Sequence, residues 1–241
     1  MYKEKLKSII ENSNNIVFFG GAGVSTESGI PDFRSSEGIY SKRIDQKISP
    51  EEIISHSFFK RNTEEFFKFY KENMIYTDAK PNTAHIVLAE LEREGKLKAI
   101  VTQNIDGLHQ MAGSKNVLEL HGSIHRNYCE NCGKKYSLDY IINSDGVPRC
   151  TECNGIVRSD VVLYEESLDM EVLERAVDFI QKADVLIVGG TSLVVYPAAG
   201  LIRYYGGDKL ILINKSETPY DNRALLTFND SIGKVLGYLK D

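Results

Sequence analysis

The sequence predicts an α/β fold, in which a Rossmann-type parallel sheet carries an inserted small domain. Three observations support this prediction. Short apolar segments alternate with segments of helical periodicity, which is typical of a parallel sheet covered by helices on both faces. A glycine-rich turn follows the first apolar segment. Two stretches of different composition, residues 41–78 and 126–157, interrupt the alternation.

The predicted elements follow one another along the chain. Short apolar runs predict strands at residues 16–19, 99–102, 117–120, 184–188 and 210–213. Helical spacing of apolar residues predicts helices at residues 83–94, 171–182 and 197–205. We therefore assign residues 1–40, 79–125 and 158–241 to the Rossmann-type domain, residues 41–78 to a helical module with a Phe- and Tyr-rich core, and residues 126–157 to a cysteine-containing module.

Composition limits the class of protein. The chain has 241 residues, of which 42% are hydrophobic and 26% charged, and this excludes a disordered chain. The formal net charge is −5, so no direct nucleic-acid partner is expected, because such proteins are usually basic. No apolar run approaches the roughly 20 residues that cross a bilayer, and residues 1–11 lack the apolar stretch of a secretory signal. We expect a cytoplasmic protein without a membrane partner.

All four cysteines lie in the second interrupting stretch, with the spacing C-x2-C-x17-C-x2-C. Two disulfides are the alternative, but disulfide frameworks belong to exported chains. Two close cysteine pairs match tetrahedral zinc, in which each turn presents two sulfurs to one ion. Because all four ligands come from the protein, the site is interpreted as closed and structural. The predicted zinc ligands are Cys129, Cys132, Cys150 and Cys153.

The glycine-rich turn Gly21-Ala22-Gly23 follows the first predicted strand. Such a turn lets backbone N–H groups approach phosphates. The third glycine of G-x-G-x-x-G is replaced by Thr26, and no second strand ending in an acidic residue follows about 20 residues later. A bound dinucleotide is expected, whereas hydride transfer of the usual Rossmann kind is poorly supported.

Polar residues follow several other predicted strands, in the segments 102–109, 121–122, 189–192 and at Asn214. Ligands of open α/β sheets bind beyond the carboxyl ends of the strands. We therefore expect these segments and the glycine turn to meet in one crevice.

These motifs resemble those of the sirtuins, the NAD-dependent protein deacylases. The resemblance rests on GAGVSTESGIPDFR (21–34), TQNIDGLH (102–109), His121-Gly122, the two cysteine pairs, GTSLVVYPAAG (190–200) and Ile213-Asn214, in that order. It covers nearly the whole chain and indicates a single catalytic core of the bacterial type. The resemblance implies that a Rossmann-type domain, a helical module and a zinc module bind NAD and an acyl-lysine peptide between them.

The resemblance also implies the reaction and the roles of individual residues. In sirtuins the acyl oxygen attacks the ribose C1′ as nicotinamide leaves, and a histidine then acts as general base on a ribose hydroxyl. The products are free lysine, nicotinamide and O-acetyl-ADP-ribose. Carried over, the catalytic residues are His121 as that base and Asn104, which holds the reacting ribose and a water. The implied NAD contacts are Ala22, Thr26, Phe33, Arg34, Gln103, Ile105, Asp106, His121, Thr191, Ser192, Asn214 and Ile232.

The acetyl-lysine peptide is implied to lie as an extended strand between two segments, one from Val161 to Glu166 and one from Val194 to Tyr196. The family commonly has Phe-Gly-Glu where this chain has Tyr164-Glu165-Glu166, and the two carboxylates suggest a mild preference for basic peptides. Sirtuins that remove succinyl groups carry Tyr-x-x-Arg, but here the residue three positions after Tyr70 is Asn73. A buried acyl carboxylate without a cation is costly, so neutral acyl groups are expected, acetyl first.

The sequence leaves two alternatives to a protein deacetylase open. One is a deacylase for other acyl groups, or an NAD-dependent ADP-ribosyltransferase, on the same scaffold. The other is a binding module in which a zinc ribbon contacts nucleic acid. Acidic and basic residues nearly cancel in the ribbon, which argues against strong phosphate binding.

Overall fold

The computed structural model describes residues 2–33, 38 and 48–240. Its main feature is a parallel six-stranded sheet with the order β3-β2-β1-β7-β8-β9. The strands are β1 (Ile16–Gly20), β2 (Leu97–Thr102), β3 (Val117–Glu119), β7 (Val185–Gly189), β8 (Leu210–Ile213) and β9 (Leu226–Phe228). Along the chain, β2 and β3 add to one side of β1, and β7, β8 and β9 then add to its other side. This order is that of dinucleotide-binding Rossmann folds, whose ligands bind where the direction reverses.

Strand β1 shows why the sheet is buried on both faces. Ile16 and Phe18 point into one hydrophobic cluster, and Val17 and Phe19 point into another. Successive side chains of a strand face opposite sides, so an unbroken apolar run places two cores back to back. All four side chains are fully buried.

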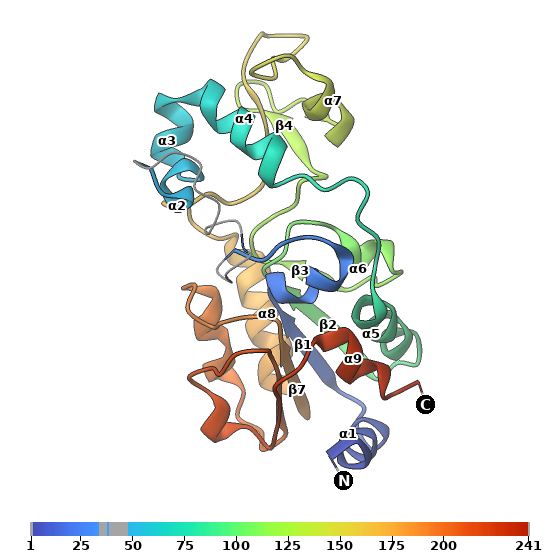
Figure 1. The fold of residues 1–241 in the computed structure, drawn as a ribbon. Coiled ribbons are helices and arrows are strands. Elements are labelled where there is room, and N and C mark those ends of the chain that lie inside the picture. The colour runs from blue at the N-terminus through green and yellow to red at the C-terminus, as the bar shows by residue number, and fades with distance from the viewer. Residues whose placement is uncertain (1, 34–37, 39–47, 241) are drawn as a thin grey trace.

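Helices cover each face of the sheet (Figure 1). The first face carries α1 (Tyr2–Glu11), α5 (Thr83–Arg93) and α9 (Ile232–Gly237). The second face carries α8 (Met170–Lys182) and the 3-10 helix η4 (Ala198–Tyr204). Side-chain caps define where the long helices begin: Asn82 accepts from Ala84 N, and Asp169 accepts from Glu171 N.

A smaller lobe lies at the carboxyl edge of the sheet (Figure 1). It combines three helices with a three-stranded antiparallel sheet of order β5-β4-β6 and one further helix. These elements are α2 (Pro50–Ile53), α3 (His56–Arg61), α4 (Thr63–Asn73), β4 (Asn127–Cys129), β5 (Lys135–Tyr136), α7 (Leu138–Asn143) and β6 (Val157–Ser159). The aromatic residues of α3 and α4 form its core together with Cys129 and Cys150. The lobe is therefore one hydrophobic unit built from two separate stretches of chain.

The predicted fold class is confirmed, and the differences concern individual elements. The predicted helix at 197–205 is the 3-10 helix η4, which contains Gly200, a residue of low helical propensity. The sequence patterns predict no element where α1, β9 and α9 lie. The predicted module boundary at residue 157 falls inside β6, whose residues pair with β4.

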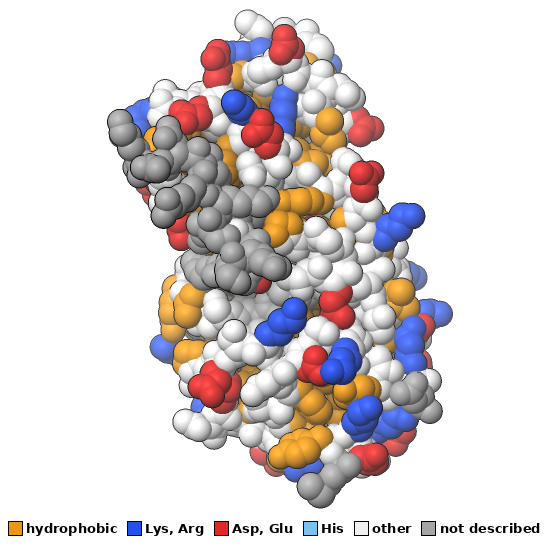
Figure 2. Space-filling view, viewed as in Figure 1, with side chains coloured by type: hydrophobic (Ala, Val, Ile, Leu, Met, Phe, Trp, Pro, Cys, Tyr) orange, Lys and Arg blue, Asp and Glu red, His pale blue; other side chains and the backbone are white. Residues whose placement is uncertain are grey.

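Two surface properties accompany the fold. Acidic and basic side chains of the described residues are interspersed on the face shown in Figure 2. Among the residues that the structure describes, no helix is long and apolar enough to cross a membrane.

Candidate active site

A cavity of about 590 Å³ lies where the carboxyl ends of β1, β2, β7 and β8 face the smaller lobe. It brings together nearly all of the predicted NAD-site residues. The predicted residues that line it are Ala22, Thr26, Phe33, Gln103, Asn104, Ile105, Asp106, His121, Thr191, Ser192, Asn214 and Ile232. Arg34, also predicted, lies outside the described residues. The cavity walls also include both expected peptide segments, although Val194 is exposed and does not line the cavity.

The glycine turn after β1 packs tightly against the turn after β7. A Cβ on Gly23 would lie 2.7 Å from Gly190 Cα, and a Cβ on Gly21 would lie 2.8 Å from Thr191 Cβ. Gly23 N donates to the Gly190 carbonyl at 2.8 Å. The two turns can approach only because these positions lack side chains, and the N–H of Gly23 is already used within the protein. The turn continues as two short 3-10 helices, η1 (Ala22–Val24) and η2 (Thr26–Ser28).

Ser25 links two predicted site residues that follow β2. It is 1% exposed. Its hydroxyl donates to Asp106 Oδ2 at 2.7 Å and accepts from Asn104 Nδ2 at 3.0 Å. The second carboxylate oxygen of Asp106 accepts from Leu108 N at 2.9 Å. With donors on both oxygens, the Asp106 carboxylate is fixed in direction, and so is the Asn104 amide.

His121 is oriented by the backbone of Gln103. Its Nδ1 lies 3.0 Å from the Gln103 carbonyl oxygen, which can only accept, so Nδ1 carries the proton and Nε2 has the free lone pair in the neutral ring. Burial lowers the pKa of His121, and the bond to Gln103 opposes this in part. The Gln103 side chain in turn donates from Nε2 to Thr191 Oγ1 at 3.0 Å. The imidazole is therefore positioned as a neutral base.

Gly122 allows the chain to turn directly after His121. Its φ is +73°, and a Cβ there would lie 2.3 Å from the Asp160 carbonyl oxygen. On either side of this contact, Val162 N donates to the His121 carbonyl at 3.0 Å and Ser123 N donates to Asp160 Oδ1 at 2.8 Å. The histidine and the first peptide segment are thus held together by backbone contacts.

The carboxylates of the first peptide segment are already bound within the protein. Glu166 accepts from both Nη1 and Nη2 of the buried Arg158, at 2.7 and 3.0 Å, and Arg158 and His56 lower its pKa to about 2 despite burial. Glu165 has a φ of +75°, a conformation that favours glycine. Its Oε2 accepts from Ser57 N, at the start of α3, at 2.8 Å. The expected preference for basic peptides depended on free carboxylates at Glu165 and Glu166, and both are already bound by donors of the protein itself.

Several residues that line the cavity were not identified from the sequence. At the smaller lobe they include Ile54, Met74 and Tyr76, and at the far end Lys215, Asp230 and Ser231. Asp and Ser before an apolar segment are a helix-start signature, and this signal could have located the start of α9, which carries Ile232. Nothing local marks Ile54 or Met74 as site residues, because they reach the cavity only through the packing of the smaller lobe.

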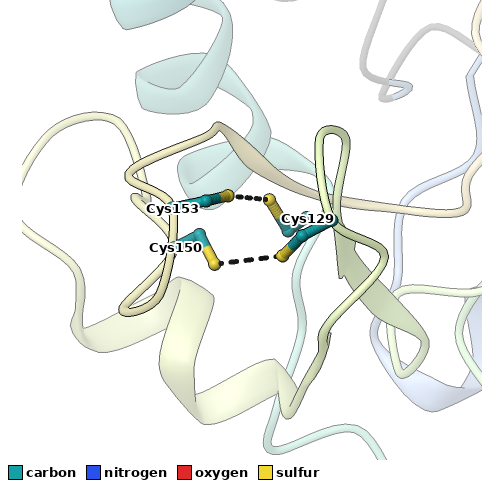
Figure 3. Close-up of side chains that lie close together, drawn as sticks. Cys129, Cys150 and Cys153 are labelled. Carbon is teal, nitrogen blue, oxygen red and sulfur yellow. Dashed lines mark hydrogen bonds between the residues drawn. The ribbon is translucent and has the colours of Figure 1, made fainter.

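The four cysteines form a compact sulfur cluster (Figure 3). Their Sγ atoms lie within 4.8 Å of one another. Cys129 and Cys153 are 3.4 Å apart, and Cys132 and Cys150 are 3.6 Å apart. A disulfide requires about 2.05 Å, whereas a tetrahedral ion with Zn–S bonds of about 2.3 Å separates its sulfurs by roughly 3.8 Å. The cysteines are free thiols whose arrangement fits zinc.

The fold and the site define a two-lobed, dinucleotide-binding protein of Rossmann type with a zinc ribbon in its smaller lobe. The sequence model of the Sir2 family matches residues 21–197. An NAD-dependent protein deacetylase of Clostridium perfringens is 66% identical over 98% of both chains. A solved Sir2 structure with a deacetylated p53 peptide and 3′-O-acetyl ADP ribose is 40% identical, with a TM-score of 0.91, over 99% of this chain and 97% of the other. A Sir2 complex with a p53 peptide and NAD⁺ is 41% identical, with a TM-score of 0.86, over 98% and 96%. The chain belongs to the Sir2 family.

Proposed function

We propose that this protein is an NAD-dependent protein-lysine deacetylase, which transfers the acetyl group of a lysine side chain to ADP-ribose and releases nicotinamide. The observation that carries the proposal is the geometry of His121. Its Nδ1 is bound to the Gln103 carbonyl, and its ring lines the same cavity as the glycine turn and both peptide segments. The curated relative from Clostridium perfringens has this activity in its name.

Bound NAD supplies a ribose whose bond to the positively charged nicotinamide ring breaks readily. In the proposal, the neutral His121 accepts a proton at Nε2 from a ribose hydroxyl. Asn104 and Asp106 are fixed through Ser25. Asn104 would hold the reacting ribose and a water, and Asp106 with Ile105 would hold the nicotinamide carboxamide. Phe33 would cover the ribosyl face after nicotinamide leaves and exclude water, and Ala22 and Thr26, which line the same cavity, would lie at the phosphates and ribose. Thr191, Ser192, Asn214 and Ile232 also line the cavity and would contact the adenosine half of NAD.

The acetyl-lysine peptide would lie between the segments that contain Val161 to Glu166 and Val194 to Tyr196. The acyl end of the cavity includes Tyr70 and Asn73. In the part of the lining that the structure describes, Lys215 is the only lysine or arginine, and it follows β8 beside Asn214 at the dinucleotide end. A negatively charged acyl group would therefore meet no cation among these residues, which supports a preference for acetyl over succinyl.

The zinc ion would be held by the four cysteines and would act structurally. Cys129 and Cys150 belong to the core of the smaller lobe, so the ion would fix the ribbon against the helical module. In this proposal residues 1–40, 79–125 and 158–241 form the NAD-binding domain and residues 41–78 and 126–157 form the small domain, except that Arg158 and Ser159 complete β6 in the small domain. The free thiols also support a cytoplasmic location, where cysteines stay reduced.

The direct test incubates an acetyl-lysine peptide with and without NAD and follows both the peptide and the nucleotide by mass spectrometry. We expect NAD-dependent loss of acetyl and the appearance of O-acetyl-ADP-ribose. His121→Ala should lower the rate at least about hundredfold, the usual contribution of a general base. Because burial lowers the pKa of His121, the wild-type rate should fall only when the pH drops below about 6.5, the ordinary value.

Each outcome distinguishes a different function. A succinyl-lysine peptide that reacts as fast as the acetyl peptide would refute the acyl preference. Gain of ADP-ribose on a protein without loss of acetyl would indicate an ADP-ribosyltransferase. A folded His121→Ala variant with full activity would exclude His121 as the base. Unchanged thermal unfolding of this variant serves as the control for folding.

A further inference from the structure

The outer edge of the second peptide segment carries a pair of arginines set among tyrosines. Tyr196 lines the cavity and is 59% exposed. Arg203, on η4, donates from Nη2 to Tyr196 Oη at 3.3 Å and from Nε to Tyr220 Oη at 3.4 Å. Its guanidinium lies 5.9 Å from the Tyr196 ring centre, and that of Arg223 lies 5.9 Å from the Tyr220 ring centre. We call Tyr196, Arg203, Tyr220 and Arg223 the arginine–tyrosine edge.

The positive charge of this edge is not neutralised by the described residues around it. Arg203 and Arg223 are exposed, and neither forms an ion pair with any carboxylate in the described part of the chain. Tyrosine hydroxyls hold the Arg203 side chain in place without cancelling its charge. The opposite wall differs, because Glu166 is bound by Arg158 and Glu165 caps α3. The groove therefore has one wall whose carboxylates are held by donors within the protein and one wall whose two guanidiniums have no carboxylate partner among the described residues.

We propose that Arg203 selects substrates that carry an acidic side chain two or three residues from the acetyl-lysine. This inference rests on the proposed deacetylase function. An extended peptide advances about 3.3 Å per residue, so a side chain at that distance passes the cavity mouth where Tyr196 stands. The planar guanidinium is suited to bind a carboxylate with two parallel hydrogen bonds.

The test compares peptides that have glutamate or glutamine at one position, two or three residues before or after acetyl-lysine. Glutamate and glutamine have nearly the same shape, so their ratio of kcat/KM reports the charge alone. We expect the glutamate peptide on one flank to react about threefold to fivefold more efficiently, as for a solvent-exposed ion pair. The ratio should approach one in 0.5 M salt, because exposed charges are then screened.

Variants identify the residue responsible. Arg203→Gln should bring the ratio close to one, and Arg203→Lys should keep most of it. Arg93→Gln is the matched control: it removes the same charge from an exposed residue at the end of α5, on another part of the sheet, and should leave the ratio unchanged. Equal rates for the two wild-type peptides on both flanks would overturn the proposal, as would a preference that survives Arg203→Gln. Failure of the deacetylase proposal would show separately, as no NAD-dependent turnover of the glutamine peptides.

Discussion

The turn at Gly122 provides a quantitative test of how the histidine is positioned. Gly122→Ala adds one methyl group at a residue with a φ of +73°, 2.3 Å from the Asp160 carbonyl oxygen. Gly95→Ala is the matched control, because Gly95 has a φ of +76° but no atom within 4 Å of the added Cβ. Both variants carry the cost of a left-handed conformation, and only one carries the contact.

The two costs can be estimated separately. A left-handed alanine costs about 1 kcal/mol, and forcing a methyl group into a packed site adds about 2 kcal/mol. We therefore expect Gly95→Ala to lose about 1 kcal/mol of unfolding free energy and Gly122→Ala about 3 kcal/mol. For a domain of this size that corresponds to decreases in Tm of about 3 °C and about 9 °C.

Activity provides the second readout. Relief of the contact must move Asp160 or Gly122, and the neighbouring bond from Val162 N to the His121 carbonyl links both to the proposed base. A displacement near 1 Å at a reacting group costs about hundredfold in rate, so Gly122→Ala should lose at least tenfold in kcat/KM at 25 °C while Gly95→Ala keeps its activity. Calorimetry and the peptide assay measure the two effects. Equal decreases in Tm, or full activity of Gly122→Ala, would refute the reasoning.

Two further predictions concern the buried histidines and the zinc module. His85 and His109 are almost fully buried with ring centres 4.7 Å apart, and burial lowers the pKa of both. Below about pH 6.5 the unfolded chain therefore binds protons that the folded chain does not. The unfolding free energy measured in urea should fall between pH 7 and pH 5, by up to about 1.4 kcal/mol per pH unit for each ring. A pH-independent unfolding free energy, or an unchanged slope in His109→Phe, would contradict this. Tyr136 Oη donates to Cys150 Sγ at 3.1 Å, so Tyr136→Phe should weaken zinc retention about tenfold in competition with a chromogenic chelator. Tyr140→Phe, which loses only a bond to the Arg149 carbonyl, should behave as wild type, and equal zinc loss in the two variants would argue against the role of the sulfur bond.

The sequence alone determined the features that depend on local pattern. The run of apolar residues at 16–19 specifies a strand buried on both faces, and the helix of Thr83–Arg93 follows from its apolar spacing. The cysteine spacing specifies a four-sulfur cluster because each pair sits in one tight turn. The resemblance carried by the ordered motifs also indicated the NAD-site residues, which all line the cavity except Arg34, a residue outside the described part of the chain.

Only the tertiary structure decided how these residues act on one another. The bond between Ser25 and Asp106 joins residues 81 positions apart, the Gln103 carbonyl fixes the tautomer of His121, and the bidentate contact with Arg158 occupies Glu166. Strand β9 is too short to stand apart from a loop by its local pattern, and helix α9 is marked locally only by the Asp and Ser residues that precede it. Periodicity reports which face of an element is buried, whereas hydrogen-bond direction, charge neutralisation and closure of the cavity depend on partners that folding brings from elsewhere in the chain.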